Sequence, residues 1–271
     1  MNPVHVAAPD CVNLAVYEWG RADGPEVLHV HGYCGSAGAW EKQQRAALAG
    51  QLRLAACDLR GHGSSDKPLE PPYYKDPARW ADELKAVLDG MALQRPLAVA
   101  WGYGAAVLGD YLACYGSARL GAIMLVGVLI RVHAPGHGPA RRHIPHMRSE
   151  NVAENVAATR AYLRAQFAQQ PAQEDFELLP GAAMMVAVQV RRAMIGRPIE
   201  MEPALAALEI PLRAVHGERD AVAHPALGRY GADTAKRGQL SLYQGCGHAP
   251  FFESPDRFNR ALAQLVKEAL A

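Results

Sequence analysis

The chain has 271 residues, of which 50% are hydrophobic and 20% are charged, and its formal net charge is +1. This length suits one large α/β domain, and the composition is that of an ordinary globular protein. A charge so close to zero produces no long-range field that would attract nucleic acid or an anionic membrane, so we expect neither as a partner.

The chain contains five widely spaced cysteines: Cys11, Cys34, Cys57, Cys114 and Cys246. No two of them have C-x-x-C spacing, which argues against a zinc knuckle or a redox motif. The first ten residues lack the basic stretch and apolar run of a secretory signal, and no apolar run is long enough to span a bilayer. We therefore expect reduced thiols in a cytoplasmic protein.

Short apolar runs predict buried strands at residues 27–31, 52–57, 97–100, 122–126, 212–215 and 240–242. Runs of this kind are typical of parallel strands that are covered on both faces.

Helical patterns alternate with these strands. Asp76 is a natural N-cap and Pro77 suits the first helical position, while Ser254 and Pro255 repeat the arrangement near the end of the chain. Apolar residues follow each start at helical spacing: Trp80, Leu84, Val87, Leu88 and Met91 in the first helix, and Phe258, Leu262, Leu265, Val266 and Ala269 in the second. Strands that alternate with helices predict βαβ units and a mostly parallel sheet.

The pattern changes between residues 131 and 200, where strand-like runs vanish and helical patterns cover residues 152–167 and 184–195. We therefore expect a helical cap at 131–200, inserted between two parts of one α/β core at 1–130 and 201–271.

The sequence L-A-V-A-W-G-Y-G at residues 97–104 combines a strand with a glycine-rich turn, and a helical pattern follows from Ala105. A tight turn of this kind demands positive φ, which Gly102 adopts easily. An ordinary glycine-rich turn is the alternative reading. A phosphate loop is disfavoured, because the third glycine of a dinucleotide motif is missing.

Three further motifs follow predicted strands. H-G-Y-C-G lies at residues 31–35, and D-L-R-G-H-G-S-S-D-K-P lies at 58–68. Near the end of the chain, H-G-E-R-D at 216–220 is followed by G-C-G-H-A-P-F at 245–251.

Taken in order, these segments resemble the motifs of α/β-hydrolases over nearly the whole chain. The resemblance implies the α/β-hydrolase fold, with a mostly parallel central sheet flanked by helices and a helical cap. It also implies that Asp220 is the acid and His248 the base of a catalytic triad, and that backbone N–H groups of Tyr33 and Tyr103 form an oxyanion hole. The loop at 58–68 has a mainly structural role in the family.

The nucleophile position of the family falls on Gly102, where a carboxylesterase or lipase-like enzyme carries Ser. The chain is therefore either an inactivated ester hydrolase or one in which His248 activates water directly. Cys34 is a poor substitute nucleophile because it lies beside the oxyanion hole. Two alternatives remain open: a cofactor-independent lyase or oxygenase with His248 as general base, and a ligand-binding protein without catalysis.

We expect a small apolar ester as substrate, with Trp101 beside the turn and Met184 and Met185 of the cap lining its pocket. His29 and His31 alternate along one strand, but no carboxylate or cysteine accompanies them at ligand spacing, so we expect no metal. The resemblance implies no cofactor.

Overall fold

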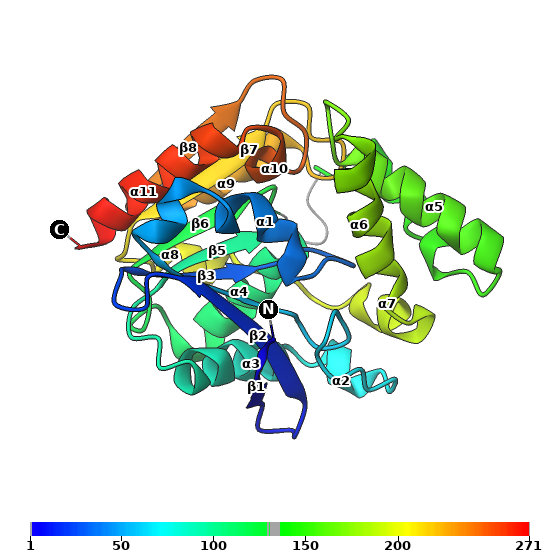
Figure 1. Cartoon of the computed structure of the whole chain (residues 1–271), viewed down its shortest axis with the longest axis horizontal. Coiled ribbons are helices and arrows are strands. Elements are labelled where there is room, and N and C mark those ends of the chain that lie inside the picture. Colours follow the sequence, from blue (N-terminus) through cyan, green and yellow to red (C-terminus); the bar gives the residue numbers. More distant parts are fainter. Residues whose placement is uncertain (1, 129, 131–135, 271) are drawn as a thin grey trace.

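The structure is a computed structural model that describes residues 2–128, 130 and 136–270. Eight strands form one sheet in the order β1-β2-β4-β3-β5-β6-β7-β8 (Figure 1). The strands are β1 (Val4–Ala7), β2 (Asn13–Gly20), β3 (Glu26–Val30), β4 (Arg53–Cys57), β5 (Leu97–Trp101), β6 (Ala122–Val126), β7 (Leu212–Gly217) and β8 (Gly238–Tyr243). Strand β2 pairs antiparallel with both β1 and β4, and all the other pairs are parallel, which confirms the predicted fold class.

The α-helices are α1 (Glu41–Gln44), α2 (Pro72–Lys75), α3 (Pro77–Gly90), α4 (Tyr103–Tyr115), α5 (Val152–Ala165), α6 (Gln173–Met184), α7 (Val188–Met194), α8 (Glu202–Ala206), α9 (Pro225–Thr234), α10 (Pro250–Glu253) and α11 (Pro255–Leu270). Short 3-10 helices are η1 (Ala37–Trp40), η2 (Ala47–Gly50), η3 (Pro139–His143) and η4 (His146–Arg148). None of the described helices is long and apolar enough to cross a membrane.

Two apolar layers cover the faces of the sheet. Helices α3, α4, α8 and α9 contribute to one layer, and η1, α10 and α11 contribute to the other (Figure 1). Because side chains alternate across a strand, β5 serves both layers: Ala98 and Ala100 face the first, and Val99 and Trp101 face the second. The central strands are therefore rigidly held on both sides.

The predicted helix starts agree with the structure. The Asp76 carboxylate accepts a hydrogen bond of 2.9 Å from the Ala78 N–H, and α3 begins at Pro77. Helix α11 begins at Pro255, and Phe258 and Leu262 on its apolar face are fully buried.

Strands β1 and β2 were not predicted from the sequence. They are antiparallel, and β2 has an exposed residue at Asn13 and partly exposed residues near Glu18. The buried run of β2 is limited to Leu14–Val16, and only Val6 of β1 is buried, so both strands differ from the longer apolar runs of the buried parallel strands.

The prediction of one helix over residues 184–195 was wrong. Met184 ends α6, and α7 begins only at Val188. The buried guanidinium of Arg191 donates to the carbonyls of Ala183 and Val186, which satisfies the backbone groups left free where α6 stops. This contact depends on the packing of the cap.

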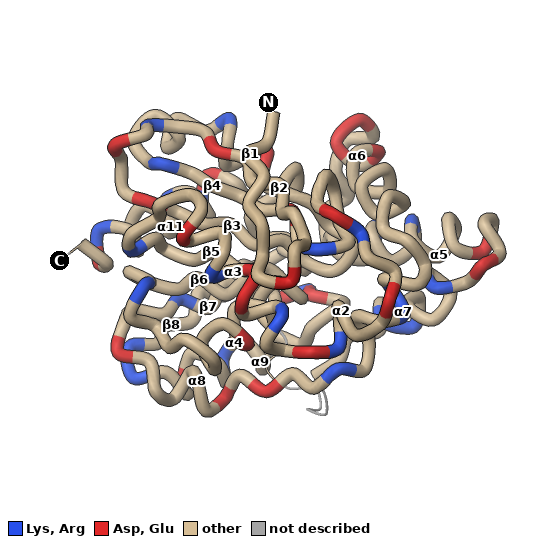
Figure 2. Tube along the Cα trace, turned by 90° about the horizontal axis from the view of Figure 1, so that it is seen from below, with Lys and Arg blue, Asp and Glu red and all other residues tan. Residues whose placement is uncertain are grey.

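The cap region between β6 and β7 holds η3, η4, α5, α6 and α7 and projects from one end of the sheet (Figure 1). The predicted start of the cap at residue 131 lies outside the described residues. In Figure 2, the positions of Lys and Arg are interspersed with those of Asp and Glu along the Cα trace, without one large region of a single sign in this view.

The loop at 58–68 is fixed by buried charges. The Asp58 carboxylate accepts hydrogen bonds from the Ala37 N–H at 2.7 Å and the Ser64 N–H at 2.8 Å. The fully buried Arg60 pairs with Glu83 at 2.6 Å and with Asp10 at 2.7 Å. These contacts join the loop to η1 and α3, which is a structural role.

We predict that Arg60→Met lowers the free energy of unfolding by about 3–5 kcal/mol, because it leaves the buried Glu83 carboxylate without its cation. Arg79→Met is the matched control: Arg79 also pairs with Asp10 but is partly exposed, so we expect a loss of at most about 1 kcal/mol. Urea denaturation measures both. Equal losses for the two variants would contradict the role given to the buried pair.

Candidate active site

Gly102 lies at the turn between β5 and α4, with φ +52° and ψ −113°. Residues that carry a side chain rarely adopt this backbone conformation, so the turn favours glycine. The turn is held by a 2.9 Å hydrogen bond from the Gly102 N–H to the Val126 carbonyl. At Gly104, an added Cβ would lie 2.6 Å from the backbone oxygens of Val30 and His31, so α4 passes very close to β3.

His248 lies directly above this turn. A Cβ built on Gly102 would be 3.0 Å from His248 Nε2, and His248 Nδ1 is 2.8 Å from Asp220 Oδ2. The backbone of His248 is fixed on both sides, because its N–H donates to the Gln166 carbonyl at 2.7 Å and its carbonyl accepts from Trp101 Nε1 at 2.9 Å. The structure therefore brings Asp220, His248 and position 102 into one row.

The Asp220 carboxylate accepts four hydrogen bonds. The N–H groups of Val222 and Ala223 donate to Oδ1 at 2.7 and 2.9 Å, while His248 and His216 contact Oδ2 at 2.8 and 3.0 Å. Burial raises the pKa of Asp220, but the charge of His248 and the hydrogen bonds from both histidines outweigh it and hold the pKa below its ordinary value. An ionised Asp220 keeps the proton of a neutral His248 on Nδ1, which leaves Nε2 free to act as a base toward position 102.

His216 is a site residue to which the sequence analysis gave no role. Its Nε2 also lies 2.9 Å from the Ala223 carbonyl. Because both neighbours are acceptors, Nε2 must carry a proton. The fully buried His216 therefore positions Asp220. The sequence signal was available: His216 is the last residue but one of β7 and lies four residues before Asp220.

Tyr33 and Tyr103 line the same cavity as Gly102 and His248. Tyr103 is the first residue of α4, so its N–H has no partner within the helix. Tyr33 lies in the turn closed by the Gly35 N–H and the Gly32 carbonyl, and its N–H donates to no group in the described part of the chain. Two such donors beside one base can stabilise a developing oxyanion.

The cavity is small, with a volume of about 40 Å³. Its described lining consists of Gly32, Tyr33, Trp101, Gly102, Tyr103, Arg141, Ile144, Tyr162, Gln166, Ile195, Val222 and His248. A second cavity shares Tyr33 and Trp101 and extends along the cap, where Leu163, Leu178 and Leu179 line it. Core and cap thus both contribute walls, and Trp101 lies where it was expected.

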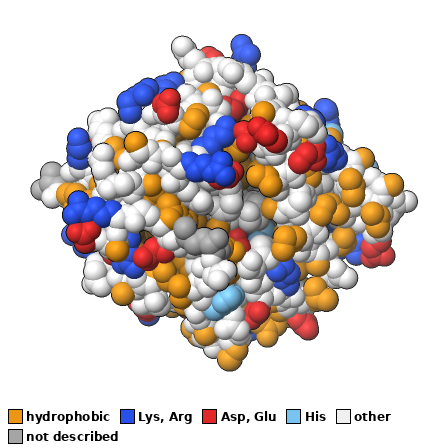
Figure 3. Space-filling view, viewed as in Figure 1, with side chains coloured by type: hydrophobic (Ala, Val, Ile, Leu, Met, Phe, Trp, Pro, Cys, Tyr) orange, Lys and Arg blue, Asp and Glu red, His pale blue; other side chains and the backbone are white. Residues whose placement is uncertain are grey.

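Met184 and Met185 are not brought together with the other expected site residues. They are 40% and 53% exposed and line neither of these cavities, although Met185 lines a groove that adjoins the second cavity. Figure 3 shows hydrophobic side chains at the surface on the side where Figure 1 places α5, α6 and α7.

His29 and His31 have structural surroundings. Both are fully buried, and burial lowers the pKa of each to about 4. His31 Nε2 accepts a 3.0 Å hydrogen bond from the Leu59 N–H, which links β3 to the loop after β4. Among the residues that the structure describes, no group of three metal-binding side chains is placed to hold an ion.

The Cys34 thiol is fully enclosed beside Tyr33, and burial raises its pKa to about 11. A thiol with so high a pKa carries almost no thiolate at neutral pH and is a weak nucleophile.

We predict that Cys34 resists alkylation in the folded protein, while the exposed Cys11 and Cys114 are modified. The measurement is peptide mapping by mass spectrometry after iodoacetamide treatment at pH 8. Denatured protein, in which all five cysteines should react, is the control. Rapid modification of Cys34 in the native protein would show that its thiol is accessible and ionised.

Comparison with known proteins agrees with this geometry. Residues 27–261 match the model of the alpha/beta hydrolase family. A solved structure from Burkholderia cenocepacia, provisionally described as an aryl esterase, is 34% identical with a TM-score of 0.95, covering 99% of each chain. An esterase from Rhodococcus sp. ECU1013 is 29% identical with a TM-score of 0.92, covering 98% of this chain and 99% of the other.

A bifunctional esterase/perhydrolase of Acinetobacter calcoaceticus is 24% identical over 97% of this chain and 99% of its own length. The match of the family model over most of the sequence, together with the strand–turn–helix geometry at Gly102, shows that the chain belongs to the alpha/beta hydrolase family.

Proposed function

We propose that this chain binds a small carboxylic ester and hydrolyses it by direct attack of water, with His248 as the general base. One observation carries the proposal: the position of a Cβ at residue 102 is 3.0 Å from His248 Nε2, and Asp220 holds the opposite ring nitrogen. A serine esterase has its hydroxyl at this position, whereas Gly102 leaves space for a water molecule.

The reaction then follows from the groups around this space. His248 Nε2 accepts a proton as the water oxygen bonds to the ester carbonyl carbon. The N–H groups of Tyr33 and Tyr103 stabilise the negative oxygen, and Asp220 stabilises the charged imidazole. His248 returns the proton to the alkoxide as the C–O bond breaks, which gives a carboxylic acid and an alcohol.

Such a reaction is slow compared with serine catalysis. Binding and an oxyanion hole retain roughly a 10³–10⁴-fold acceleration over water when a triad member is lost. The esterase relatives support an ester as the substrate, and the leucines of α5 and α6 suit an apolar acyl or aryl group. We further propose that the cap, as predicted at 131–200, selects the substrate.

Gly102→Ser should raise the kcat/KM for p-nitrophenyl butyrate by at least about 100-fold, because the base, the acid and the oxyanion donors are already in place. It should also lower stability by about 1–3 kcal/mol, because serine must adopt the positive φ of the turn. The His248 ring must also move by a few tenths of an ångström to admit the Cβ.

Gly102→Ala is the matched control, since it has the same Cβ and the same backbone strain but no hydroxyl. We expect it to be as destabilised as Gly102→Ser and no more active than the unaltered chain. A folded Gly102→Ser variant without increased hydrolysis would refute the view that Gly102 marks an otherwise complete esterase site.

The unaltered chain should hydrolyse an activated ester without forming an acyl-enzyme, and His248→Ala should remove this activity. Intact-protein mass spectrometry after rapid quenching tests the first point, and steady-state rates test the second. An adduct on Cys34 that forms and decays at the turnover rate would overturn the water mechanism. Tight ester binding without any turnover would instead favour a role in ligand binding.

A further inference from the structure

We propose that the cavity beside Gly102 contains an anion subsite at Arg141, so that the preferred ligand is an ester that also carries a free carboxylate. The ester part of this inference rests on the proposed function, whereas the carboxylate part rests on Arg141 and its surroundings. It replaces the expectation of a wholly apolar substrate.

Arg141 lies on η3 and lines the same cavity as Gly102 and His248. Among the described residues of that lining, it is the one Lys, Arg, Asp or Glu. Its side chain is partly buried, and burial lowers the pKa of the guanidinium, as expected for a cation that has lost part of its hydration. The cavity therefore presents a positive charge close to the reacting position.

The guanidinium of Arg141 has no ion pair or hydrogen bond within the described part of the chain. The buried arginines of the described chain are all paired: Arg60 with Glu83, Arg197 with Asp110, Arg213 with Glu268, and Arg191 with oxygens of the region between β6 and β7. Residues 129 and 131–135, which precede Arg141 and are not described, include no Asp or Glu. The chain thus offers Arg141 no carboxylate from this segment.

The tyrosines near Arg141 do not supply the missing charge. Burial raises the pKa of Tyr33 and of Tyr162, so both phenols are neutral. An unpaired cation in a closed site is unfavourable, and a ligand carboxylate would remove that penalty. The planar guanidinium suits a carboxylate because it can donate two parallel hydrogen bonds.

Gln166 is a further polar residue of the cavity lining. It is 2% exposed, and its Oε1 has no hydrogen-bond partner in the described part of the chain, although its amide interacts with the Tyr162 hydroxyl. Since the oxygen and nitrogen of a side-chain amide are assigned from their surroundings, this amide can present either an acceptor or a donor to a ligand.

Ile144, Ile195 and Val222 supply apolar walls in the same lining. Because this cavity is small, a short hydrocarbon chain with an ester at one end and a carboxylate at the other would also extend into the adjoining cavity that shares Tyr33 and Trp101. Repulsion by Asp220 is limited, because its carboxylate is buried and accepts four hydrogen bonds. The class of ligand is therefore the half ester of a short dicarboxylic acid.

The test measures binding, so that it does not depend on turnover. Calorimetry of the unaltered chain compares monomethyl esters of succinate, glutarate, adipate and suberate with the corresponding dimethyl esters. We expect at least one half ester to bind 10-fold or more tightly than its diester. Arg141→Gln should abolish this preference, and Arg141→Lys should retain part of it, because lysine keeps the charge but loses the planar fork.

Arg142→Gln is the matched control, since Arg142 is the exposed neighbour on the same turn and loses the same charge. It should leave the preference unchanged, and thermal melting should show all three variants folded. Equal binding of half ester and diester, a preference that survives in Arg141→Gln, or no binding of any half ester at millimolar concentration would each overturn the subsite. A clear preference combined with an inactive Gly102→Ser variant would refute the esterase proposal alone.

Discussion

The positive φ of Gly102 is the constraint on which the rest of the site depends. The turn follows β5, which is buried between two apolar layers, and precedes α4. Helix α4 can pass so close to β3 because residue 104 is glycine and has no Cβ. This fixed geometry places Tyr103, the first residue of α4, in the cavity lining and puts a Cβ at position 102 within 3.0 Å of His248 Nε2. Both features depend on the positive φ at Gly102.

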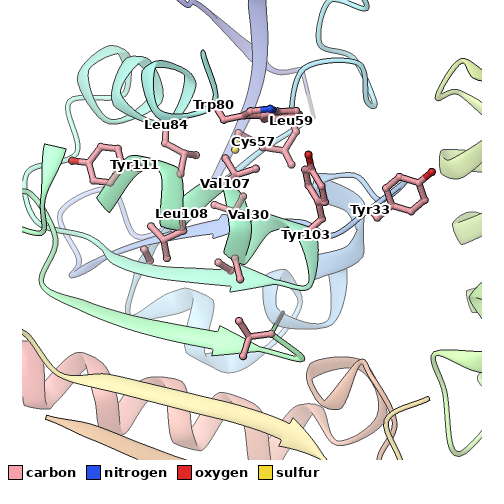
Figure 4. Packing of buried hydrophobic residues seen from close by; sticks show 14 of the residues in the cluster. Val30, Tyr33, Cys57, Leu59, Trp80, Leu84, Tyr103, Val107, Leu108 and Tyr111 are labelled. Carbon is pink, nitrogen blue, oxygen red and sulfur yellow. The ribbon is translucent and has the colours of Figure 1, made fainter. Parts of the chain in front are cut away.

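Tyr33 and Tyr103, the residues proposed to supply the oxyanion donors, are also linked to α7. Figure 4 shows the side chains of Tyr33 and Tyr103 at the edge of the packed core. The Tyr33 hydroxyl donates to the Arg191 carbonyl and the Tyr103 hydroxyl donates to the Met194 carbonyl, both at 3.3 Å, and both acceptors belong to α7. A movement of α7 would therefore act on two residues that line the cavity beside Gly102.

Features set by local pattern could be predicted from the sequence. The central strands, the start of α3 and the turn at Gly102 follow from neighbouring residues. The order of the loops predicted that Asp220 and His248 belong to one site. Features set by distant contacts could not. The break between α6 and α7 depends on the side chain of Arg191, the outward position of Met184 depends on cap packing, and the missing partner of Arg141 is visible only once its neighbours are placed.

The hydrogen bonds around Asp220 help to interpret the absence of a side chain at residue 102. Four hydrogen bonds stabilise the buried carboxylate of Asp220. This carboxylate in turn orients the ring of His248. A purely structural role would not require Nε2 to lie 3.0 Å from the place of a Cβ at residue 102. Glycine avoids the backbone strain that serine would bear at this φ. The base proposed here, His248, nevertheless keeps its hydrogen bond to Asp220 and its position beside residue 102. Residue 102 is thus the position at which a serine hydroxyl would be gained at the expense of stability. In the proposed function, His248 and Asp220 act on water or hold a ligand.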